Sequence, residues 1–401
     1  MTRDASLADD PTDEVPRGLI LLMAAACAVV VANIYYVQPI VGIVSRDYGL
    51  SVAMSGLLVT VTQLGYAAGL LFIVPLGDIV ENRTLIVVTL AVLVAALIVA
   101  VVAPSAGIFL TASLAIGIAA STVQVIVPFA GHLAADATRG RVVGSVVSGL
   151  LLGIMLSRPA ASFAAHLAGA RAIFAISMVA TTGIALILAL RLPRRRPEGM
   201  PYLHVLASLL PLLRDTPVLQ RRAAYQAAMF GCFSLFWTAV PLLLEGPTFR
   251  FSQVGIGLFA LVGAGGAIAS PFAGRAADAG HTRLVTGAAL IAAILSFPAA
   301  ALGAARHSVA ILVVAAFVLD AAVAMSLVTG QRAIFALGAA ARGRLNGLFL
   351  AMFFLGGAFG SFAAGIAYAH GGWTAACVVG ACLPALALAY WATDRGTRDL
   401  D

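Results

Sequence analysis

The sequence predicts an all-α integral membrane protein with twelve transmembrane helices, arranged as two six-helix bundles related by pseudo-symmetry. The prediction rests on the composition, on twelve long apolar runs and on a repeat between the two halves. Of the 401 residues, 62% are hydrophobic and only 10% are charged, whereas a soluble domain is about half apolar and a quarter charged. This composition excludes an ordinary cytosolic enzyme, a disordered protein and a nucleic-acid binder.

A helix needs about 20 apolar residues to cross a bilayer, and the chain contains twelve such runs. We expect the spans at residues 18–43, 52–76, 84–103, 107–133, 141–165, 170–190, 222–244, 253–276, 284–304, 308–334, 344–368 and 373–392. The runs are too long and too uniformly apolar for the alternating strands of a membrane barrel. The first run follows an acidic segment and exceeds the length of a signal peptide, so we expect it to stay in the protein.

Arginine sets the expected orientation, because all 24 basic residues are arginine. With the N-terminus inside, 19 arginines fall in inside segments and 4 in outside loops. Inside loops of membrane proteins carry such an excess of positive charge. We therefore expect both termini in the cytoplasm, and we assign the basic charge to topology in a lipid bilayer, with no nucleic-acid partner.

The sequence lacks the residue patterns that are typical of cofactor and metal sites. A chain without lysine lacks the lysine of an ATP-binding P-loop and of a Schiff-base site, so we expect no cofactor. The four cysteines lie within apolar runs, and the six histidines are scattered without the spacing of metal ligands. We therefore predict no metal site and expect no enzymatic activity.

The chain is duplicated around a long basic break at residues 191–221. RGRVVG at 139–144 matches RGRLNG at 342–347, and Asp78 with Arg83 matches Asp278 with Arg283. We expect a disordered cytoplasmic tail at residues 1–16 and a first bundle at 17–190. A cytoplasmic loop with an interfacial helix follows at 191–221. A second bundle at 222–393 and a second cytoplasmic tail at 394–401 complete the chain. Repeated bundles of this kind hold a solute site between the halves, near the bilayer midplane.

Asp320 lies about midway along the tenth predicted span. A carboxylate costs about 2.5–3.5 kcal/mol at the centre of a membrane helix, so intramembrane acids often mark proton or ion pathways. Asp320 is therefore our candidate for proton coupling. The alternative is a structural carboxylate that is hydrogen-bonded to a neighbouring helix.

Arg158 is the second charge inside a span, and Pro159 follows it. Arginine keeps its proton, so it requires a partner or an anionic solute. It can pair with Asp320, bind a carboxylate or phosphate of a solute, or extend toward the membrane surface as a structural residue.

With these motifs, the sequence resembles the major facilitator superfamily over almost its whole length. The loop PLGDIVENR after the second span keeps Leu76, Asp78 and Arg83 of the family pattern G-x-L-x-D-R-x-G-R-R, but it departs from it at other positions. GRAADAGHTR after the eighth span keeps Gly274, Asp278 and Arg283. NIYYVQP in the first span resembles a bacterial branch that includes proton-linked exporters of drugs, sugars and nucleosides.

The resemblance implies that the first, fourth, seventh and tenth spans line a solute cavity. Candidate solute-binding residues there, together with Arg158 of the fifth span, are Asn33, Tyr36, Gln38, Gln124, Trp237 and Gln331. Asn33 and Tyr36 are expected on one face of a continuous helix. The alternative for each residue is interhelical hydrogen bonding or, for the aromatic residues, a place in the interfacial belt.

The resemblance also implies a charged latch that closes the cytoplasmic side. Its candidates are Asp78, Arg83, Asp278, Arg283, Arg141 and Arg344, and the alternative for the arginines is topology alone. Gly65 with Gly69, and Gly149 with Gly153, form GxxxG pairs, which we expect at the interface between the two halves.

The expected function is secondary active transport by alternating access in the cell inner membrane. The resemblance favours antiport, in which protons enter and a small solute leaves. A proton symporter or uniporter is the alternative, and an integral membrane enzyme or lipid scramblase is a more distant one. We expect a monomer, because one chain supplies both halves of the cavity.

Overall fold

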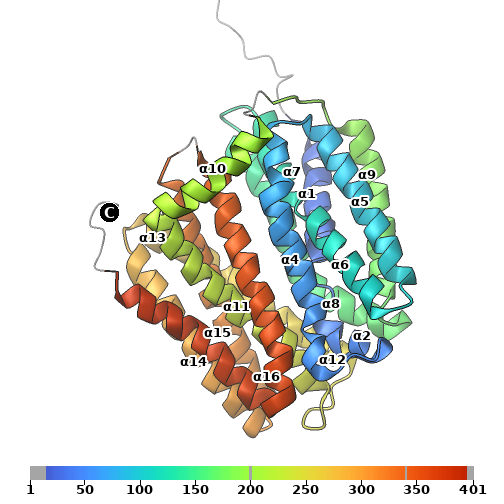
Figure 1. Cartoon of the computed structure of the whole chain (residues 1–401), viewed down its shortest axis with the longest axis vertical. Helices are drawn as coiled ribbons and strands as arrows, with labels where there is room; N and C mark the ends of the chain where they lie inside the picture. The colour runs from blue at the N-terminus through green and yellow to red at the C-terminus, as the bar shows by residue number, and fades with distance from the viewer. Residues whose placement is uncertain (1–14, 198–200, 339–340, 395–401) are drawn as a thin grey trace, which may run out of the picture.

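The computed structural model describes residues 15–197, 201–338 and 341–394. Every regular element in these ranges is a helix, as the apolar runs predict. The predicted tails lie almost wholly outside the described residues. The helices form two bundles side by side, joined along the chain by α10 (Figure 1).

The N-terminal bundle contains the first half of the chain. Its elements are α1 (Arg17–Ala32), η2 (Gln38–Ile40), α2 (Val41–Asp47), α3 (Val52–Ser55), α4 (Leu57–Phe72), η3 (Val74–Asp78), α5 (Asn82–Val102), α6 (Ala106–Ala120), α7 (Val123–Leu133), α8 (Arg139–Ala168) and α9 (Ala172–Arg191).

The C-terminal bundle begins earlier than predicted, because Pro217 occupies the first turn of its first helix, where proline fits. Its elements are α11 (Pro217–Glu245), α12 (Gln253–Ala260), η4 (Leu261–Ala264), α13 (Gly265–Asp278), α14 (Thr282–Ala305), α15 (Val309–Phe335) and α16 (Arg342–Ala392). The predicted interfacial helix is α10 (Tyr202–Asp215).

Ten helical segments of the described chain are long and apolar enough to cross a membrane. The longest, α16, contains two crossings, because Gly371 and Gly372 leave the helical region and Gly372 has φ of +60°. The shorter α1 completes the first crossing together with α2. The described chain therefore accounts for twelve crossings, which confirms the predicted fold class.

The first span is interrupted, which corrects the expectation of one continuous helix over 18–43. α1 ends at Ala32, and Asn33 to Val37 form turns before η2 starts at Gln38. The amide of Asn33 donates to the Val29 carbonyl at 2.8 Å, within the last turn of α1. Pro39 follows in η2 and cannot donate a backbone hydrogen bond. Asn33 and Tyr36 therefore do not share a helical face.

The GxxxG glycines pack within the bundles, which corrects their predicted place between the halves. A Cβ on Gly65 would overlap the Leu114 carbonyl of α6, and a Cβ on Gly153 would overlap the Ala28 carbonyl of α1. The close approach between the bundles lies at other residues, where α3 and α4 meet α16. A Cβ on Gly365 of α16 would lie 2.7 Å from the carbonyl oxygen of Ala53 in α3, and Figure 1 shows α4 and α16 side by side.

We call the face with Arg17, α10 and Thr393 the terminal face, and the opposite face, with α2 and the start of α12, the distal face (Figure 1). α10 lies across the terminal face and contacts both bundles. The Tyr202 hydroxyl donates to the Phe72 carbonyl at 2.8 Å, and Arg344 donates to the Ser208 hydroxyl at 2.9 Å. The amphipathic helix therefore links the two bundles at one end of the molecule.

Candidate functional site

A charged cluster lies between the bundles, in the interior of the protein. Arg158 comes from α8 of the N-terminal bundle, and Asp320 comes from α15 of the C-terminal bundle. Their exposed fractions are only 2% and 5%. Charges so deeply buried need partners or a functional reason.

Each charged side chain has a polar partner close by. The indole Nε1 of Trp237 on α11 donates to Asp320 Oδ1 at 2.8 Å. Arg158 Nε donates to Gln38 Oε1 at 2.8 Å, and Gln38 begins the short helix η2 just after the break in the first span. The break therefore brings a glutamine of the first span to the arginine of the fifth.

Three aromatic rings surround the guanidinium of Arg158. Its Cζ lies 4.6 Å from the ring centroid of Trp237, 5.1 Å from that of Tyr35 and 5.2 Å from that of Phe233. A cation within about 6 Å of a ring face is attracted by the quadrupole of the ring, most strongly when water is excluded. We call Gln38, Tyr35, Arg158, Phe233, Trp237 and Asp320 the interbundle site.

Arg158 and Asp320 approach one point on η4 without forming a direct ion pair among the described residues. A Cβ built on Gly263 would lie 3.1 Å from Asp320 Oδ2 and 3.4 Å from Arg158 Nη1. Glycine at this position therefore lets the backbone of η4 lie against both charged groups. The structure thus brings the two intramembrane charges together through Trp237 and Gly263.

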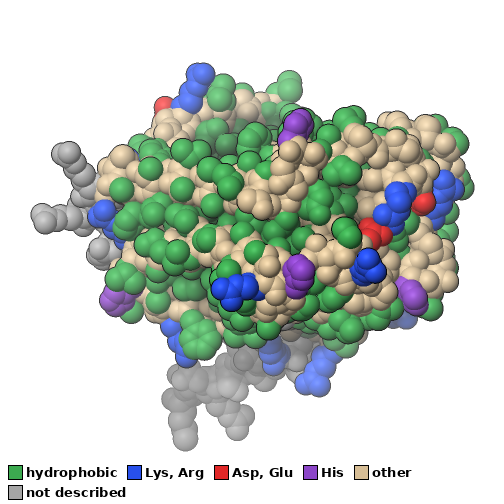
Figure 2. All heavy atoms as spheres, turned by 90° about the horizontal axis from the view of Figure 1, so that it is seen from below, with side chains coloured by type: hydrophobic (Ala, Val, Ile, Leu, Met, Phe, Trp, Pro, Cys, Tyr) green, Lys and Arg blue, Asp and Glu red, His purple; other side chains and the backbone are tan. Residues whose placement is uncertain are grey.

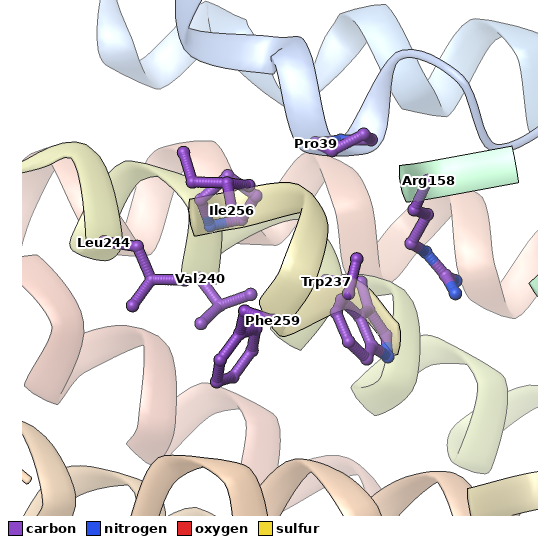
Figure 3. Close-up of a pocket in the computed structure, with 9 residues that line it drawn as sticks. Pro39, Arg158, Trp237, Val240, Leu244, Ile256 and Phe259 are labelled. Carbon is purple, nitrogen blue, oxygen red and sulfur yellow. The ribbon is translucent and has the colours of Figure 1, made fainter. Parts of the chain in front are cut away.

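Very little open space remains beside the cluster. A cavity of about 10 Å³ lies between Arg158, Trp237, Pro39, Ile256 and Phe259. Figure 3 shows Arg158 and Trp237 on one side of it and apolar side chains on the other. A volume of about 10–15 Å³ holds one water molecule, so this conformation is packed around the site.

The distal side of the interface is closed by direct contacts between the bundles. Arg46 of α2 forms an ion pair with Glu245 at the end of α11. Gly42 makes room for it, since a Cβ there would overlap the Glu245 carboxylate. The side chains are packed across this face in Figure 2, with few charged groups among them.

The terminal side carries an open groove within the C-terminal bundle, between α15 and the start of α16. The groove has a volume of about 490 Å³ and is lined by Gln331, Arg332, Phe335 and Arg342, with neighbours on α15. Gln331 donates to Asn346 at 3.2 Å, so this predicted solute residue lies on the groove and not in the interbundle site.

The other predicted solute residues lie inside the N-terminal bundle. Asn33 accepts a hydrogen bond from Ser177 at 2.8 Å. The ring of Tyr36 packs edge-on against Phe174, with the centroids 6.5 Å apart. Gln124 donates to the Tyr66 hydroxyl at 3.3 Å. Of the predicted solute residues, Gln38, Arg158 and Trp237 therefore meet Asp320.

The predicted latch residues lie on the terminal face but use other partners. Asp278 pairs with Arg332, and Arg283 lies 5.2 Å from the ring centroid of Trp391. Arg83 donates to the Ala189 carbonyl, and Arg344 binds α10 as described above. Asp78 ends η3, and Arg141 lies in the first turn of α8. Asp278 and Arg283 therefore have different partners in this conformation.

Two features were missed by the sequence analysis. One is the ion pair of Arg46 with Glu245, which joins residues far apart in the chain. The other is a buried polar contact between the bundles, in which Gln63 of α4 donates to the Ser234 hydroxyl at 2.7 Å. No local pattern signals either one, because each partner is ordinary in its own segment.

The described residues contain no group of three or more His, Cys, Asp or Glu side chains arranged to hold a metal ion. The fold and the site instead define a membrane transporter of two helical bundles with a charged site between them.

Comparison with known proteins agrees with this class. The family model of the Major Facilitator Superfamily matches residues 21–267 and 223–399. The chain belongs to this superfamily and is a transporter.

Curated relatives and solved structures are also similar to the chain. It is 37% identical to the putative uncharacterized transporter YgaY of Escherichia coli (strain K12), over 95% of this chain and 96% of that protein. It is 34% identical to the probable transporter SCO4007 of Streptomyces coelicolor, over 92% and 86%. The crystal structure of the nucleoside transporter NupG shares the fold, with a TM-score of 0.74 at 14% identity over 94% of this chain and all of that one.

Proposed function

We propose that the protein is a proton-coupled secondary transporter that moves a small solute by alternating access. Asp320 carries the proton, and the solute binds in the interbundle site. The observation that carries this proposal is the burial of Asp320 beside Arg158 at the contact of the two bundles. A carboxyl group there gains or loses a proton when a rocking motion of the bundles changes its access to water.

The ion pair between the bundles on the distal side supports a cycle with two gates. We propose that Arg46 and Glu245 hold the distal gate in the conformation described here. Asp78, Arg83, Asp278, Arg283, Arg141 and Arg344 then form the terminal latch in the opposite conformation. The present partners of Arg83, Asp278 and Arg283 lie within their own bundles, which supports an open latch in this conformation.

We propose that the terminal face is cytoplasmic and that the protein resides in the cell inner membrane as a monomer. The distribution of arginine supports this orientation, since only Arg46, Arg171, Arg250 and Arg306 lie in segments assigned to the distal side. The site supports a monomer, because one chain supplies residues from both bundles.

The proton supplies the free energy for transport. Each proton that moves down a membrane potential of 100 mV releases about 2.3 kcal/mol.

The direction of coupling depends on the charge of the solute. A cation competes with the proton for Asp320, which gives antiport, the direction that the resemblance to exporters favours. An anion binds Arg158 and gains affinity when Asp320 is neutral, which gives symport. The presence of Arg158 in the same site as Asp320 favours this second candidate.

The test is proton flux in proteoliposomes with an internal pH dye. Wild type is compared with Asp320→Asn and with Asp47→Asn, a matched change at an exposed carboxylate. A panel of drugs, sugars, nucleosides, amino acids and small carboxylates is applied under an imposed pH gradient. We expect a solute-dependent proton movement in wild type and Asp47→Asn that is lost in Asp320→Asn. An undiminished movement in Asp320→Asn would contradict the proposal.

A further inference from the structure

The interbundle site contains two buried hydrogen-bond donors without a partner. Arg158 Nη2 and Gln38 Nε2 are both inaccessible to solvent and make no hydrogen bond to any described residue. Gln38 is fully buried, and its Oε1 is already engaged by Arg158 Nε. Buried polar groups are nearly always paired in native proteins, so two adjacent orphan donors point to a missing acceptor.

The acceptor that fits these donors is an anionic group. A carboxylate accepts two parallel hydrogen bonds, and arginine binds such planar groups in a bidentate manner. The guanidinium Nε is occupied by Gln38, but Nη2 and the neighbouring amide remain available.

The walls of the site fit a flat apolar body. Tyr35, Phe233 and Trp237 present their rings around the guanidinium, with centroids 4.6 to 5.2 Å from its Cζ. Aromatic walls with a few convergent polar groups are typical of sites for small organic molecules. An aromatic or otherwise flat molecule with one carboxylate satisfies both the rings and the donors.

The charges around Asp320 determine how such an anion and a proton affect each other. Arg158 on α8 and Tyr35 after α1 are the titratable groups that face Asp320. Three packed segments face Asp320 with uncharged residues: α11 with Trp237, η4 with Gly263 and α13 with Gly266. The only charged residue of α14 is Arg283, in its first turn. An ionised Asp320 repels an incoming anion, whereas a protonated Asp320 leaves the positive charge of Arg158 for it.

We propose that the solute is a small organic monoanion with a flat apolar body, that Arg158 and Gln38 bind its carboxylate, and that it binds together with a proton on Asp320. This inference rests on the proposed function and assigns its direction of coupling to symport. Binding affinities of two ligands are coupled reciprocally, so the anion stabilises the protonated carboxyl as much as the proton strengthens anion binding. The anion then neutralises Arg158 and the proton neutralises Asp320, which allows the loaded site to open to the other side of the membrane.

The two bundles contribute different groups to the site. Gln38, Tyr35 and Arg158 come from the N-terminal bundle, whereas Phe233, Trp237 and Asp320 come from the C-terminal bundle. Since the present cavity is only about 10 Å³, the anion enters when the bundles separate. The donors for the carboxylate then remain on one bundle and the proton carrier on the other.

The test is calorimetric binding of benzoate to the purified full-length protein, with benzamide as a neutral probe and benzylammonium as a cationic probe of similar shape. We expect benzoate to bind more tightly than either of the others. Benzoate stays ionised between about pH 5.5 and 7.5, so a loss of affinity with rising pH reports on the protein. We expect a loss of about tenfold, within the usual range of coupling between two sites.

Three variants locate the effect. In Asp320→Asn the affinity for benzoate should be high and independent of pH. In Gln38→Met, which keeps both charges, it should fall several-fold while the pH dependence persists. Arg158→Gln should remove the preference for the anion, and Gln38→Met serves as the second variant if Arg158→Gln does not fold.

Stronger binding of benzylammonium, a pH-independent affinity for benzoate in wild type, or no benzoate binding would overturn the inference. The proposed function has its own readout, since proton flux that depends on Asp320 with a cationic or neutral solute would retain proton coupling without the anion. Loss of that dependence would refute the coupling itself, whichever probe binds.

Discussion

The two bundles pack their helices in the same way but differ at one position that matters. In the N-terminal bundle, Gly149 and Gly153 of α8 lie against Ala24 and Ala28 of α1. In the C-terminal bundle, Gly356 and Gly360 of α16 lie against Ala227 and Gly231 of α11. The duplicated sequence therefore builds the same close contact between helices twice.

Five residues after Gly153, and after Gly356, to which the repeat matches it, the bundles diverge. Arg158 follows Gly153 and is buried in the interbundle site, whereas Ser361 follows Gly356, and its backbone carbonyl lies against Gly56 of the other bundle. One bundle uses the position for a charge, and the other uses it for close approach between the bundles. The repeat therefore supplies the shared frame of packed helices, and the site arises where the two copies differ.

The largest expected effect comes from breaking the shared frame. Gly153→Leu and Gly360→Leu each place a side chain into the backbone of a neighbouring helix, so overpacking should exceed the usual ~1–3 kcal/mol. We expect loss of folded protein from both variants in size-exclusion chromatography after membrane extraction. Gly144→Leu is the control, because a Cβ there has no neighbour within 4 Å. Normal yield from only one of the two variants would show that the bundles are not equivalent.

The next effect concerns the charges that distinguish the bundles. Arg158→Gln or Asp320→Asn leaves one buried charge without its counterpart, at a cost of about 3–5 kcal/mol. The double variant should cost less than the sum of the single variants, because no uncompensated charge remains. Thermal unfolding in detergent measures this double-mutant cycle. Additive losses would mean that the two groups do not interact.

A smaller effect is expected from Gly365→Ala. The added methyl group meets the carbonyl oxygen of Ala53 at 2.7 Å, and the closest atoms belong to the backbone of the other bundle. We expect this variant to destabilise the present conformation by about 1–3 kcal/mol, seen as greater labelling of a cysteine that replaces the buried Ser45 of α2 on the distal side. Gly343→Ala, with open space around it, is the matched control. Unchanged labelling in Gly365→Ala would place the interface elsewhere.

The smallest effect is expected at the distal gate. The side chains of Arg46 and Glu245 are 61% and 27% exposed, and exposed ion pairs contribute about 0–1 kcal/mol. Glu245→Gln should therefore leave thermal stability almost unchanged but raise the population that is open on the distal side by a few-fold. The same cysteine-labelling assay measures it, and Asp136→Asn, which breaks an ion pair within one bundle, should have no such effect.

The sequence predicts the spans, the duplication and the polar or charged residues that are buried inside the spans, because composition and charge within a membrane obey strict rules. Asp320, Arg158, Gln38 and Trp237 are found in this way. The sequence leaves the meeting of Arg158 with Asp320 as one alternative among several, since it depends on four helices from two bundles. The break after Ala32 shows the limit most clearly. A continuous helix through Asn33 would place Tyr36 on the same face as Asn33, so the sequence favours Tyr36. In the structure the turns after Ala32 place Tyr35, and not Tyr36, beside Arg158.

Pairings over long distances were also beyond prediction. GxxxG glycines mark a helix surface for close approach but do not name the partner, so Gly65 and Gly153 turn out to contact helices of their own bundle. Arg46 and Glu245 look like ordinary loop-end charges until the fold brings them together.

The cavity beside Arg158 and Trp237 has a consequence for the insulation of the membrane. A proton crosses a protein along a continuous file of water molecules or exchangeable groups, and this space admits one water at most, between side chains that are mainly apolar. In the conformation described here the file is cut between the site and the distal side. On the proposed function, this packing limits the leak of protons through the transporter when no solute is bound.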